Sequence, residues 1–317
     1  MSGSFEVVCS SDDRARWLDL RRTGIGASEI AAVLGESRWK SPLAVYAEKI
    51  GESSEQSDNE AMFWGIRLER PIVEVFGERT GRPVESSGQL LRSSEHPWAI
   101  ATLDARVYPR EDRWWPLEAK TSSAFKAEEW AEGPPREYYL QVQHQMLVTG
   151  TPRASIACLL GGQRLVWCDV ERDEIEIRRI VHAGRAFWDR LEGRAAPLPD
   201  GSESSRAALL DLYPRAEDTA VSLAFDFEDL FDELQELKRI EKTADARRTE
   251  IENCFKAALG NAATGLLPSG RKVSWREQQG RVDYRKCAEA LGATPDLLEK
   301  HRSKSTRVFR QHDAKES

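Results

Sequence analysis

Two alternating apolar segments separated by a short polar turn constrain the fold more than any other feature of this 317-residue chain. They are residues 98–108 (WAIATLDARVY) and 114–122 (WWPLEAKTS). Such segments are typical of β-strands that pair as a hairpin. Because side chains alternate between the two faces of a strand, Glu118 and Lys120 project from the same side. We expect the pairing to bring Asp104 close to Glu118.

Helical segments lie before and after this hairpin, and a second hairpin follows it. A Gly-x-Gly turn leads into one short helix, and a serine followed by a proline provides the N-cap and first-turn proline of the next. A further hairpin turns around a Gly-Gly pair. The helices are expected at 14–22, 28–34, 42–51, 137–149 and 173–193, and the second hairpin at 154–170. This order predicts a mixed α/β fold.

A stretch rich in Pro, Gly and Ser at 195–206 (AAPLPDGSESSR) marks the expected domain boundary. It separates residues 1–200 from a C-terminal extension, 201–317, which we expect to be mostly helical. Apolar residues recur at helical spacing from 227 to 259, before a hairpin candidate at 265–277 and a short helix at 283–291. The long charged segment predicts a helix or helix pair, packed on its own domain or paired with a partner as a coiled coil. Another polar, loop-like stretch lies at 52–60.

Charge and composition narrow the class of protein. The formal net charge is −7, yet residues 265–317 carry 12 Lys+Arg against 7 Asp+Glu, and the rest carries 34 against 46. A basic tail on an acidic body permits a phosphate-backbone partner without proving one. The five cysteines are scattered with no CxxC pair, which argues against a disulfide framework, a zinc ribbon or an iron–sulfur cluster. No apolar stretch is long enough for a membrane span or a signal peptide, so we expect a cytoplasmic protein without a membrane partner.

The pair of strands carries the most informative chemistry. Two carboxylates held a few ångströms apart repel each other unless a cation sits between them. Oxygen ligands from Asp104 and Glu118 suit Mg²⁺, a hard ion that keeps waters for substrate phosphates and for a nucleophile. Lys120 would then hold or deprotonate the attacking water, or contact the scissile phosphate. The alternative is a surface ladder of salt bridges along two strands.

Two further segments offer polar side chains to this site. Glu69 lies among apolar residues three, four or seven positions away in WGIRLERPIVEVF, so a helix there would turn this carboxylate inward, where it needs a partner. Pro71 would start or kink that helix. Tyr138, Gln141 and Gln145 form one polar stripe on the 137–149 helix, and a neutral amide can orient water or bind phosphate beside a metal. The alternatives are a paired structural Glu69 and solvent-facing glutamines.

The segment that runs from Arg21 through Gly24-Ile25-Gly26 to Ser28 opens a helix. Backbone N–H groups at a helix start, a serine hydroxyl and an upstream arginine together make a cradle for an anion. An ordinary helix entry with a capping serine is the alternative.

Five motifs in one order resemble the YqaJ-like viral recombinase family, which includes lambda-type phage exonuclease within the D…(D/E)xK nuclease superfamily. The resemblance covers about residues 10–195, so residues 201–317 receive nothing from it. It implies a restriction-endonuclease-like core, with a central mixed β-sheet flanked by helices. The motifs are LRRTGIGASEIAAVLG, WGIRLERP, ATLDARV, PLEAKTS and YYLQVQHQMLVTG.

The resemblance also implies an activity, which is Mg²⁺-dependent digestion of linear double-stranded DNA from the 5′ end, with Mn²⁺ as a substitute ion. The digestion leaves a 3′ single strand for a single-strand annealing protein, and the family's homo-oligomer is a ring-shaped trimer. An expected host compartment is the cytoplasm of a bacterial or phage-infected cell.

The family's functional residues carry over position by position. Asp104 and Glu118 resemble the principal metal ligands, with the backbone carbonyl of Ala119 as a third ligand, and Glu69 resembles the helix carboxylate near a second metal position. Lys120 matches the catalytic lysine, and Gln141 matches the glutamine that follows the active-site strands. Three further residues fall where the family binds the 5′-terminal phosphate; they are Arg21, Ser28 and Thr102.

Two alternatives stay open at this stage. One is a structure- or site-specific DNA endonuclease that uses the same metal site. The other is a DNA-end-binding adaptor whose catalytic site is inactive and whose basic tail binds the DNA.

Overall fold

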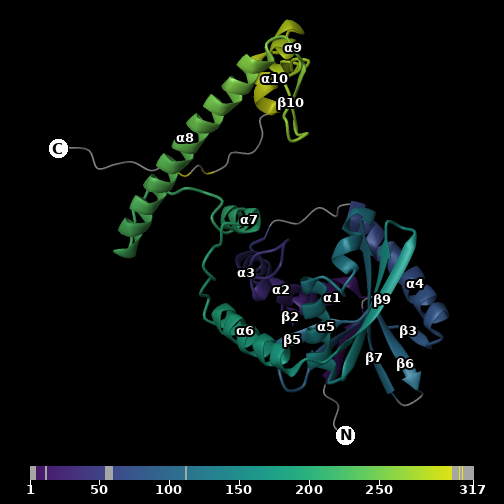
Figure 1. The fold of residues 1–317 in the computed structure, drawn as a ribbon. Coiled ribbons are helices and arrows are strands. Elements are labelled where there is room, and N and C mark those ends of the chain that lie inside the picture. Colours follow the sequence, from purple (N-terminus) through teal and green to yellow (C-terminus); the bar gives the residue numbers. More distant parts are fainter. Residues whose placement is uncertain are drawn as a thin grey trace. The chain divides into compact units, whose positions relative to one another are not determined.

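The computed structural model describes residues 5–10, 13–53, 60–110, 113–301, 307 and 309. Three predictions therefore fall partly outside the described residues: the polar stretch 52–60, the turn of the first hairpin, and the basic tail. The chain divides into two compact units, Met1–Pro214 and Arg215–Ser317 (Figure 1). The first unit continues past residue 200, because Ala208 of α7 (Glu203–Leu212) packs against Leu43 and Ala47 of α3 (Pro42–Ile50).

A five-stranded mixed sheet forms one half of the first unit, in the order β3-β6-β7-β8-β9. Strands β7 and β8 run parallel, while the other neighbours are antiparallel. The prediction of a mixed α/β fold, with a mixed sheet flanked by helices, is confirmed. The strands are β3 (Val84–Ser86), β6 (Ala105–Arg110), β7 (Arg113–Ser122), β8 (Arg153–Leu160) and β9 (Arg164–Glu171).

A second, four-stranded sheet has the order β1-β4-β5-β2. Gly24 allows the short strand β2 to lie close to β5, because a Cβ there would be 2.8 Å from Ile100 Cγ2 and 2.9 Å from the Trp98 carbonyl oxygen. Strands β2 and β5 pair in parallel, whereas β4 pairs antiparallel with both β1 and β5. The strands are β1 (Phe5–Ser10), β2 (Ile25–Gly26), β4 (Gln89–Ser93) and β5 (Ala99–Thr102).

The segment predicted as one strand at 98–108 is wrong as a single element, because it forms β5 in one sheet and β6 in the other. The segment β3–β4, which pairs with β6 and β5, bends at the same place. At the bend the carbonyls of Leu103 and Asp104 accept hydrogen bonds from the backbone of Gly88 and Ser87, each at 3.0 Å, in the loop that joins β3 to β4. The alternation of apolar and polar residues continues through the bend, where Leu103 is fully buried. The sequence pattern therefore does not reveal the bend. Asp104 lies at this junction.

Helix α5 (Arg136–Thr149) lies between the two sheets, as Figure 1 shows. Its Val142 and Met146 pack on Ile156 of the five-stranded sheet, while Leu140 and Val148 join the core that contains the four-stranded sheet. All ten residues from 140 to 149 are buried. The polar residues of this helix are therefore enclosed by protein, which requires hydrogen-bond partners or a large cost.

Helix α4 (Glu60–Thr80) covers the opposite face of the five-stranded sheet. Ile72, Val73 and Phe76 pack against Leu117 and other residues of that face. The helix neither starts nor ends at Pro71, which lies inside it. We attribute its continuity to this apolar packing, which compensates for the N–H that proline lacks.

The remaining elements of the first unit follow the predicted caps. Ser41 accepts a hydrogen bond from Ala44 N at the start of α3, and Gly51 ends the helix in the left-handed conformation. The other helices are α1 (Arg14–Arg21), the 3₁₀ turn η1 (Ala27–Glu29), α2 (Ile30–Val33), the 3₁₀ segment η2 (Ala124–Trp130) and α6 (Glu174–Glu192).

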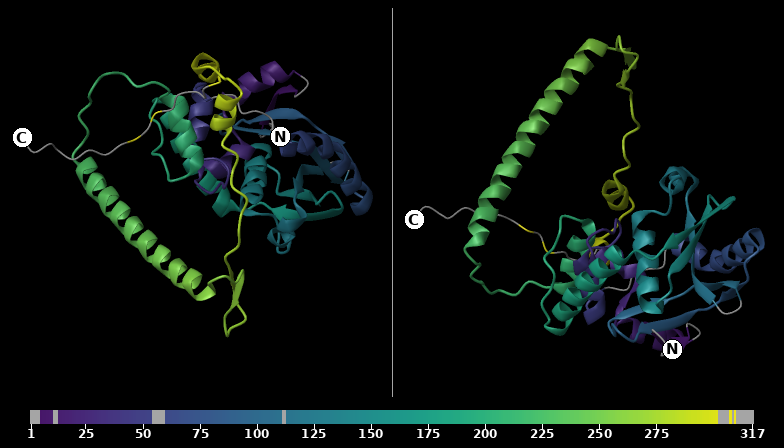
Figure 2. Two further views of the ribbon diagram at one scale, coloured as in Figure 1. Left: turned by 90° about the horizontal axis from the view of Figure 1, so that it is seen from above. Right: turned by 60° about the horizontal axis from the view of Figure 1, so that its bottom comes forward.

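The second unit contains the predicted long helix, α8 (Asp226–Leu259), which is continuous over 34 residues (Figures 1 and 2). It continues with the hairpin β10 (Thr264–Leu266) and β11 (Lys272–Ser274), and the helices α9 (Tyr284–Ala290) and α10 (Pro295–Lys300). Among the described residues, none of the helices has the length and apolar character of a membrane span.

His144 on α5 makes the fold sensitive to acid. Its ring is fully buried beside Trp98, and burial lowers the pKa of His144 from 6.5 to about 4, although the nearby backbone of Ile100 and Ile25 acts in the opposite direction. Between pH 6.5 and 4 the unfolded chain binds a proton that the folded chain refuses, so stability falls as pH falls. We expect this residue to account for about 3 kcal/mol of acid destabilisation across that window.

Thermal unfolding of wild type and His144→Leu at pH 7, 5.5 and 4 tests this expectation. The wild type should lose more melting temperature than the variant on acidification. Parallel loss in both proteins would show that other groups cause the acid sensitivity.

Candidate active site

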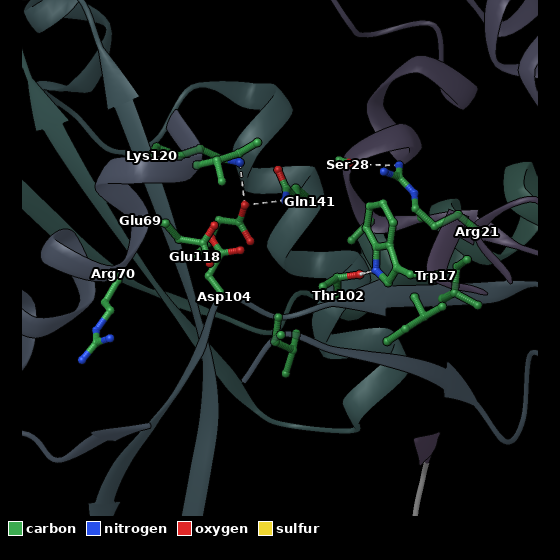
Figure 3. A pocket seen from close by; sticks show the side chains of 17 residues that line it. Trp17, Arg21, Ser28, Glu69, Arg70, Thr102, Asp104, Glu118, Lys120 and Gln141 are labelled. Atoms are coloured by element: carbon green, nitrogen blue, oxygen red, sulfur yellow. Dashed lines mark hydrogen bonds and ion pairs between the residues drawn. The ribbon is translucent and has the colours of Figure 1, made fainter. Parts of the chain in front are cut away.

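A pocket of about 540 Å³ opens where the two sheets meet. Its lining comes from α1, η1, α4, the β5–β6 junction, β7 and α5 (Figure 3). Eight residues singled out from the sequence line this one pocket: Arg21, Ser28, Glu69, Thr102, Asp104, Glu118, Lys120 and Gln141.

Glu118 is the centre of a buried hydrogen-bond network. The residue is 3% exposed. Its Oε1 accepts from Lys120 Nζ at 2.5 Å and from Gln141 Nε2 at 2.6 Å, while Oε2 accepts from Gln145 Nε2 at 2.5 Å. The expected shared face of Glu118 and Lys120 is thus present, and the polar stripe of α5 faces it. One ammonium and two amides thus fix the orientation of this carboxylate.

Lys120 is held from two sides. Glu118 lies on one, and the ring of Tyr138 lies on the other, with the ammonium 5.1 Å from the ring centroid. Trp130 stacks on the ring of Tyr138, at a centroid distance of 5.5 Å. Although burial alone would lower the pKa of Lys120, Glu118 and Asp104 outweigh it and raise the pKa above 10.5. The lysine is therefore a cation at neutral pH.

Asp104 reaches the site from the junction between the sheets. The β6–β7 register pairs Ala105 with Leu117, which places Asp104 opposite Glu118 at the next step. Its Oδ2 accepts from the backbone N–H of Ala119 at 2.8 Å. Burial, followed by the charges of Glu118 and Glu69, raises the pKa of Asp104 well above 3.8.

Glu69 reaches the same region from α4, and in Figure 3 its side chain extends toward Glu118. Burial and the charge of Glu118 raise the pKa of Glu69, while Lys120 lowers it. The apolar surroundings expected for Glu69 are present only in part: Ile72 is buried, but Ile66 is 63% exposed and lines the pocket. The reason is that this half of α4 extends past the sheet that buries the other half.

The arrangement suits a hard cation by donor type. Three carboxylates converge, and burial together with their mutual repulsion raises the pKa of Asp104 and of Glu69. A divalent ion would offset the repulsion. Within the described part of the chain, however, no three His, Cys, Asp or Glu side chains are grouped closely enough to hold a metal ion as they stand. The metal ligands therefore stay a prediction.

The other end of the pocket is cationic and rich in hydroxyls. Arg21 stacks on the ring of Trp17 at 4.8 Å from the centroid and lies 3.5 Å from Ser28 Oγ. Trp17 Nε1 donates to Thr102 Oγ1 at 3.1 Å. Each hydroxyl oxygen thus accepts a hydrogen bond from the protein, so its own O–H can donate to an acceptor such as an anion. Figure 3 shows this group beside the carboxylates.

Sequence reasoning missed part of what builds the site. Gln145 was placed with Gln141 in the polar stripe of α5, as an amide that orients water or binds phosphate, whereas in the structure it donates to Glu118. Trp17, Glu29 and Lys49 were given no role in the site. Trp17 precedes Arg21 by four residues on α1, and this spacing, which places both on one helix face, was the available signal.

Comparison with known proteins adds a family. The sequence profile of the YqaJ-like viral recombinase domain matches residues 16–152. A Bacillus subtilis (strain 168) protein, "Uncharacterized protein YqaJ", is 30% identical over 320 residues, covering 98% of this chain and 98% of its own. The chain belongs to the YqaJ-like viral recombinase family. The predicted family resemblance is confirmed, and similarity to this YqaJ-like relative includes the second unit.

Solved structures similar to this YqaJ-like chain include LHK-Exo in complex with dAMP, at 24% identity and a TM-score of 0.49, covering 57% of this chain and 94% of that chain. A structure of the alkaline exonuclease LHK-Exo from Laribacter hongkongensis is 21% identical with a TM-score of 0.45, with the same coverage.

Proposed function

We propose that this protein is a divalent-metal-dependent exonuclease that digests linear double-stranded DNA from a 5′-phosphorylated end. One observation carries the proposal: a single pocket joins a carboxylate–lysine cluster to an arginine–hydroxyl group. The first suits phosphodiester hydrolysis and the second suits a terminal phosphate. A general phosphodiesterase would need the first end alone. Membership of a viral recombinase family supports DNA as the substrate.

At the hydrolytic end, Asp104, Glu118 and the Ala119 carbonyl would hold Mg²⁺, or Mn²⁺ in its place, with Glu69 near a second position. The bound ion would polarise the scissile phosphate and lower the pKa of a water. Lys120, Gln141 and Gln145 hold the Glu118 carboxylate in place beside Asp104, so its oxygens are positioned where a cation would bind.

Lys120 would contribute through its charge. Its ammonium lies 2.5 Å from Glu118 Oε1 and can stabilise the negative charge that develops on the phosphate. Gln141 holds the Glu118 oxygen that Lys120 also contacts, and thereby orients both groups.

At the other end, Arg21, Ser28 and Thr102 would bind the 5′-terminal phosphate. The two hydroxyls keep their protons available, and Arg21 supplies the charge. Binding of the terminus beside the hydrolytic cluster would restrict cleavage to DNA ends and set the 5′-to-3′ direction. The remaining 3′ strand would suit a single-strand annealing partner. That partner, and a homo-oligomer such as a trimer, belong to this proposal through the family alone.

Digestion of linear duplex labelled separately at its 5′ and 3′ ends tests the proposal. We expect release of the 5′ label as a mononucleotide, persistence of the 3′ label, and no digestion after chelation of divalent ions. Covalently closed circular DNA should stay intact. Nicking of the circle would favour an endonuclease, and end binding without cleavage in Mg²⁺ or Mn²⁺ would favour an inactive adaptor.

A further inference from the structure

A buried cluster of three charges lies behind the cationic end of the pocket. Glu29 of η1 is 5% exposed, and the Lys49 side chain of α3 is 4% exposed. Lys49 Nζ lies 2.7 Å from Glu29 Oε2, and Arg21 Nη2 lies 3.3 Å from Glu29 Oε1. Arg21 lines the pocket, whereas Glu29 and Lys49 do not. The cluster thus has one member that substrate can reach.

Several contacts fix the geometry of this cluster. The Gly26 N–H donates to Glu29 Oε2 at 2.6 Å, and Lys49 Nζ donates to the Arg21 carbonyl at 2.6 Å. A Cβ on Gly26 would lie 3.1 Å from Glu29 Oε2, so the absence of a side chain lets the carboxylate fold back. Burial would raise the pKa of Glu29, but Lys49 and Arg21 outweigh it and lower the pKa to about 2. Glu29 is therefore an anion at neutral pH.

The charge count distinguishes a recognition role from simple structural support. Arg21 paired with Glu29 alone would be neutral and would attract phosphate weakly. Lys49 adds a second positive charge: burial lowers its pKa below 10.5, while Glu29 and the neighbouring Glu48 favour its charged form. Arg21, Glu29 and Lys49 together thus carry a net charge of +1, which reaches the pocket through Arg21. A buried ion pair contributes little net stability compared with apolar residues of the same size, so stability alone gives no reason for three charges here.

We propose that Glu29 and Lys49 are positioning residues for terminal-phosphate recognition. Glu29 fixes the Arg21 guanidinium, and Lys49 offsets the charge of Glu29 so that Arg21 keeps its attraction for phosphate. This inference rests on the proposed function of the pocket.

The test compares Lys49→Met with the double variant Glu29→Gln/Lys49→Met on linear duplexes with 5′-phosphate or 5′-hydroxyl ends. Lys49→Met leaves Arg21 neutralised, so the preference in kcat/KM for phosphorylated ends should fall about tenfold, mainly through KM. The double variant removes both inner charges and frees the charge of Arg21, so it should recover to within about threefold of wild type. Arg21→Ala shows how far the preference for phosphorylated ends falls when the guanidinium itself is removed. Lys40→Met is the matched control, because it removes a lysine that pairs with Glu48 outside the pocket.

The outcomes separate the inference from the function beneath it. Wild-type cleavage without any preference for phosphorylated ends would overturn the proposed role of the pocket. A wild-type preference that Lys49→Met leaves unchanged, or that the double variant fails to restore, would overturn the inference alone. Should Lys49→Met not fold, Lys49→Gln removes the same charge while keeping a hydrogen bond to Glu29, and the same expectation applies. Equal loss on both substrates would indicate a merely structural role and would overturn the inference.

Discussion

Lys120→Met is expected to lower turnover on linear duplex DNA at least about a thousandfold while DNA affinity stays within about threefold of wild type. The methionine keeps the length of the side chain but removes the ammonium that lies 2.5 Å from Glu118 Oε1. Gln141 and Gln145 still hold the carboxylate, so the pocket should keep its shape. The charge that develops during hydrolysis then has no cation from the protein beside it. Single-turnover digestion and equilibrium binding of the same labelled duplex measure the two quantities.

Lys40→Met is the matched control for this prediction as well, since Lys40 also pairs with one glutamate, Glu48, at 2.7 Å but lies outside the pocket. It should cleave at the wild-type rate. Turnover of Lys120→Met within tenfold of wild type would refute the catalytic assignment of this lysine. A matching loss of DNA affinity would instead assign Lys120 to substrate binding.

Local patterns predicted the elements that carry the site better than they predicted the architecture. The caps at Ser41 and Gly51 and the alternation along 114–122 depend on neighbours in the chain, and these elements formed where expected. The bend at Asp104 depends instead on hydrogen bonds from Ser87 and Gly88, which the alternating pattern does not encode. Strands as short as β2, with two residues, give no periodic signal at all.

In the site too, local patterns predicted some features and tertiary contacts determined the others. Glu118 and Lys120 lie two positions apart on one strand, so their shared face followed from strand geometry. The anion cradle from Arg21 to Ser28 followed from residue types near a helix start, and the family resemblance added Thr102. The contact between Trp17 and Thr102, which are 85 positions apart, is tertiary and has no signal in the sequence. The burial of Gln145 required knowledge that α5 lies between two sheets, which no single helical pattern contains.

Asp104→Asn is expected to abolish cleavage and, in the absence of divalent ions, to raise the melting temperature. The pKa of Asp104 is raised well above its ordinary 3.8 by burial and by Glu118 and Glu69. For an acid whose pKa is higher in the folded state, stability is present at low pH and is lost as pH rises from the unfolded pKa to the folded pKa. At neutral pH the folded wild type therefore bears a cost for burying Asp104 that the unfolded chain does not. Asparagine has no charge and can still accept the Ala119 N–H, so the variant avoids this cost.

The linkage between pKa and stability fixes the sign of the effect. Because the folded-state pKa of Asp104 is raised, the melting temperature of Asp104→Asn should lie above that of wild type at neutral pH. Asp169→Asn is the matched control with the opposite sign. Although burial would raise it, hydrogen bonds from Arg82 and Ser155 hold the pKa of Asp169 below 3.8, so that variant should lose stability.

Addition of Mg²⁺ to the same unfolding experiment connects stability with the proposed metal site. A cation between Asp104 and Glu118 would relieve their repulsion, so Mg²⁺ should raise the melting temperature of wild type and of Asp169→Asn but leave Asp104→Asn nearly unchanged. A wild-type melting temperature that does not respond to Mg²⁺ or Mn²⁺ would contradict metal binding at these carboxylates. A variant that is less stable than wild type without metal would show that the charge of Asp104 is already compensated within the protein. If Asp104→Asn gains stability and loses activity, the proposed role of Asp104 in binding the ion would explain why its unfavourable burial is kept.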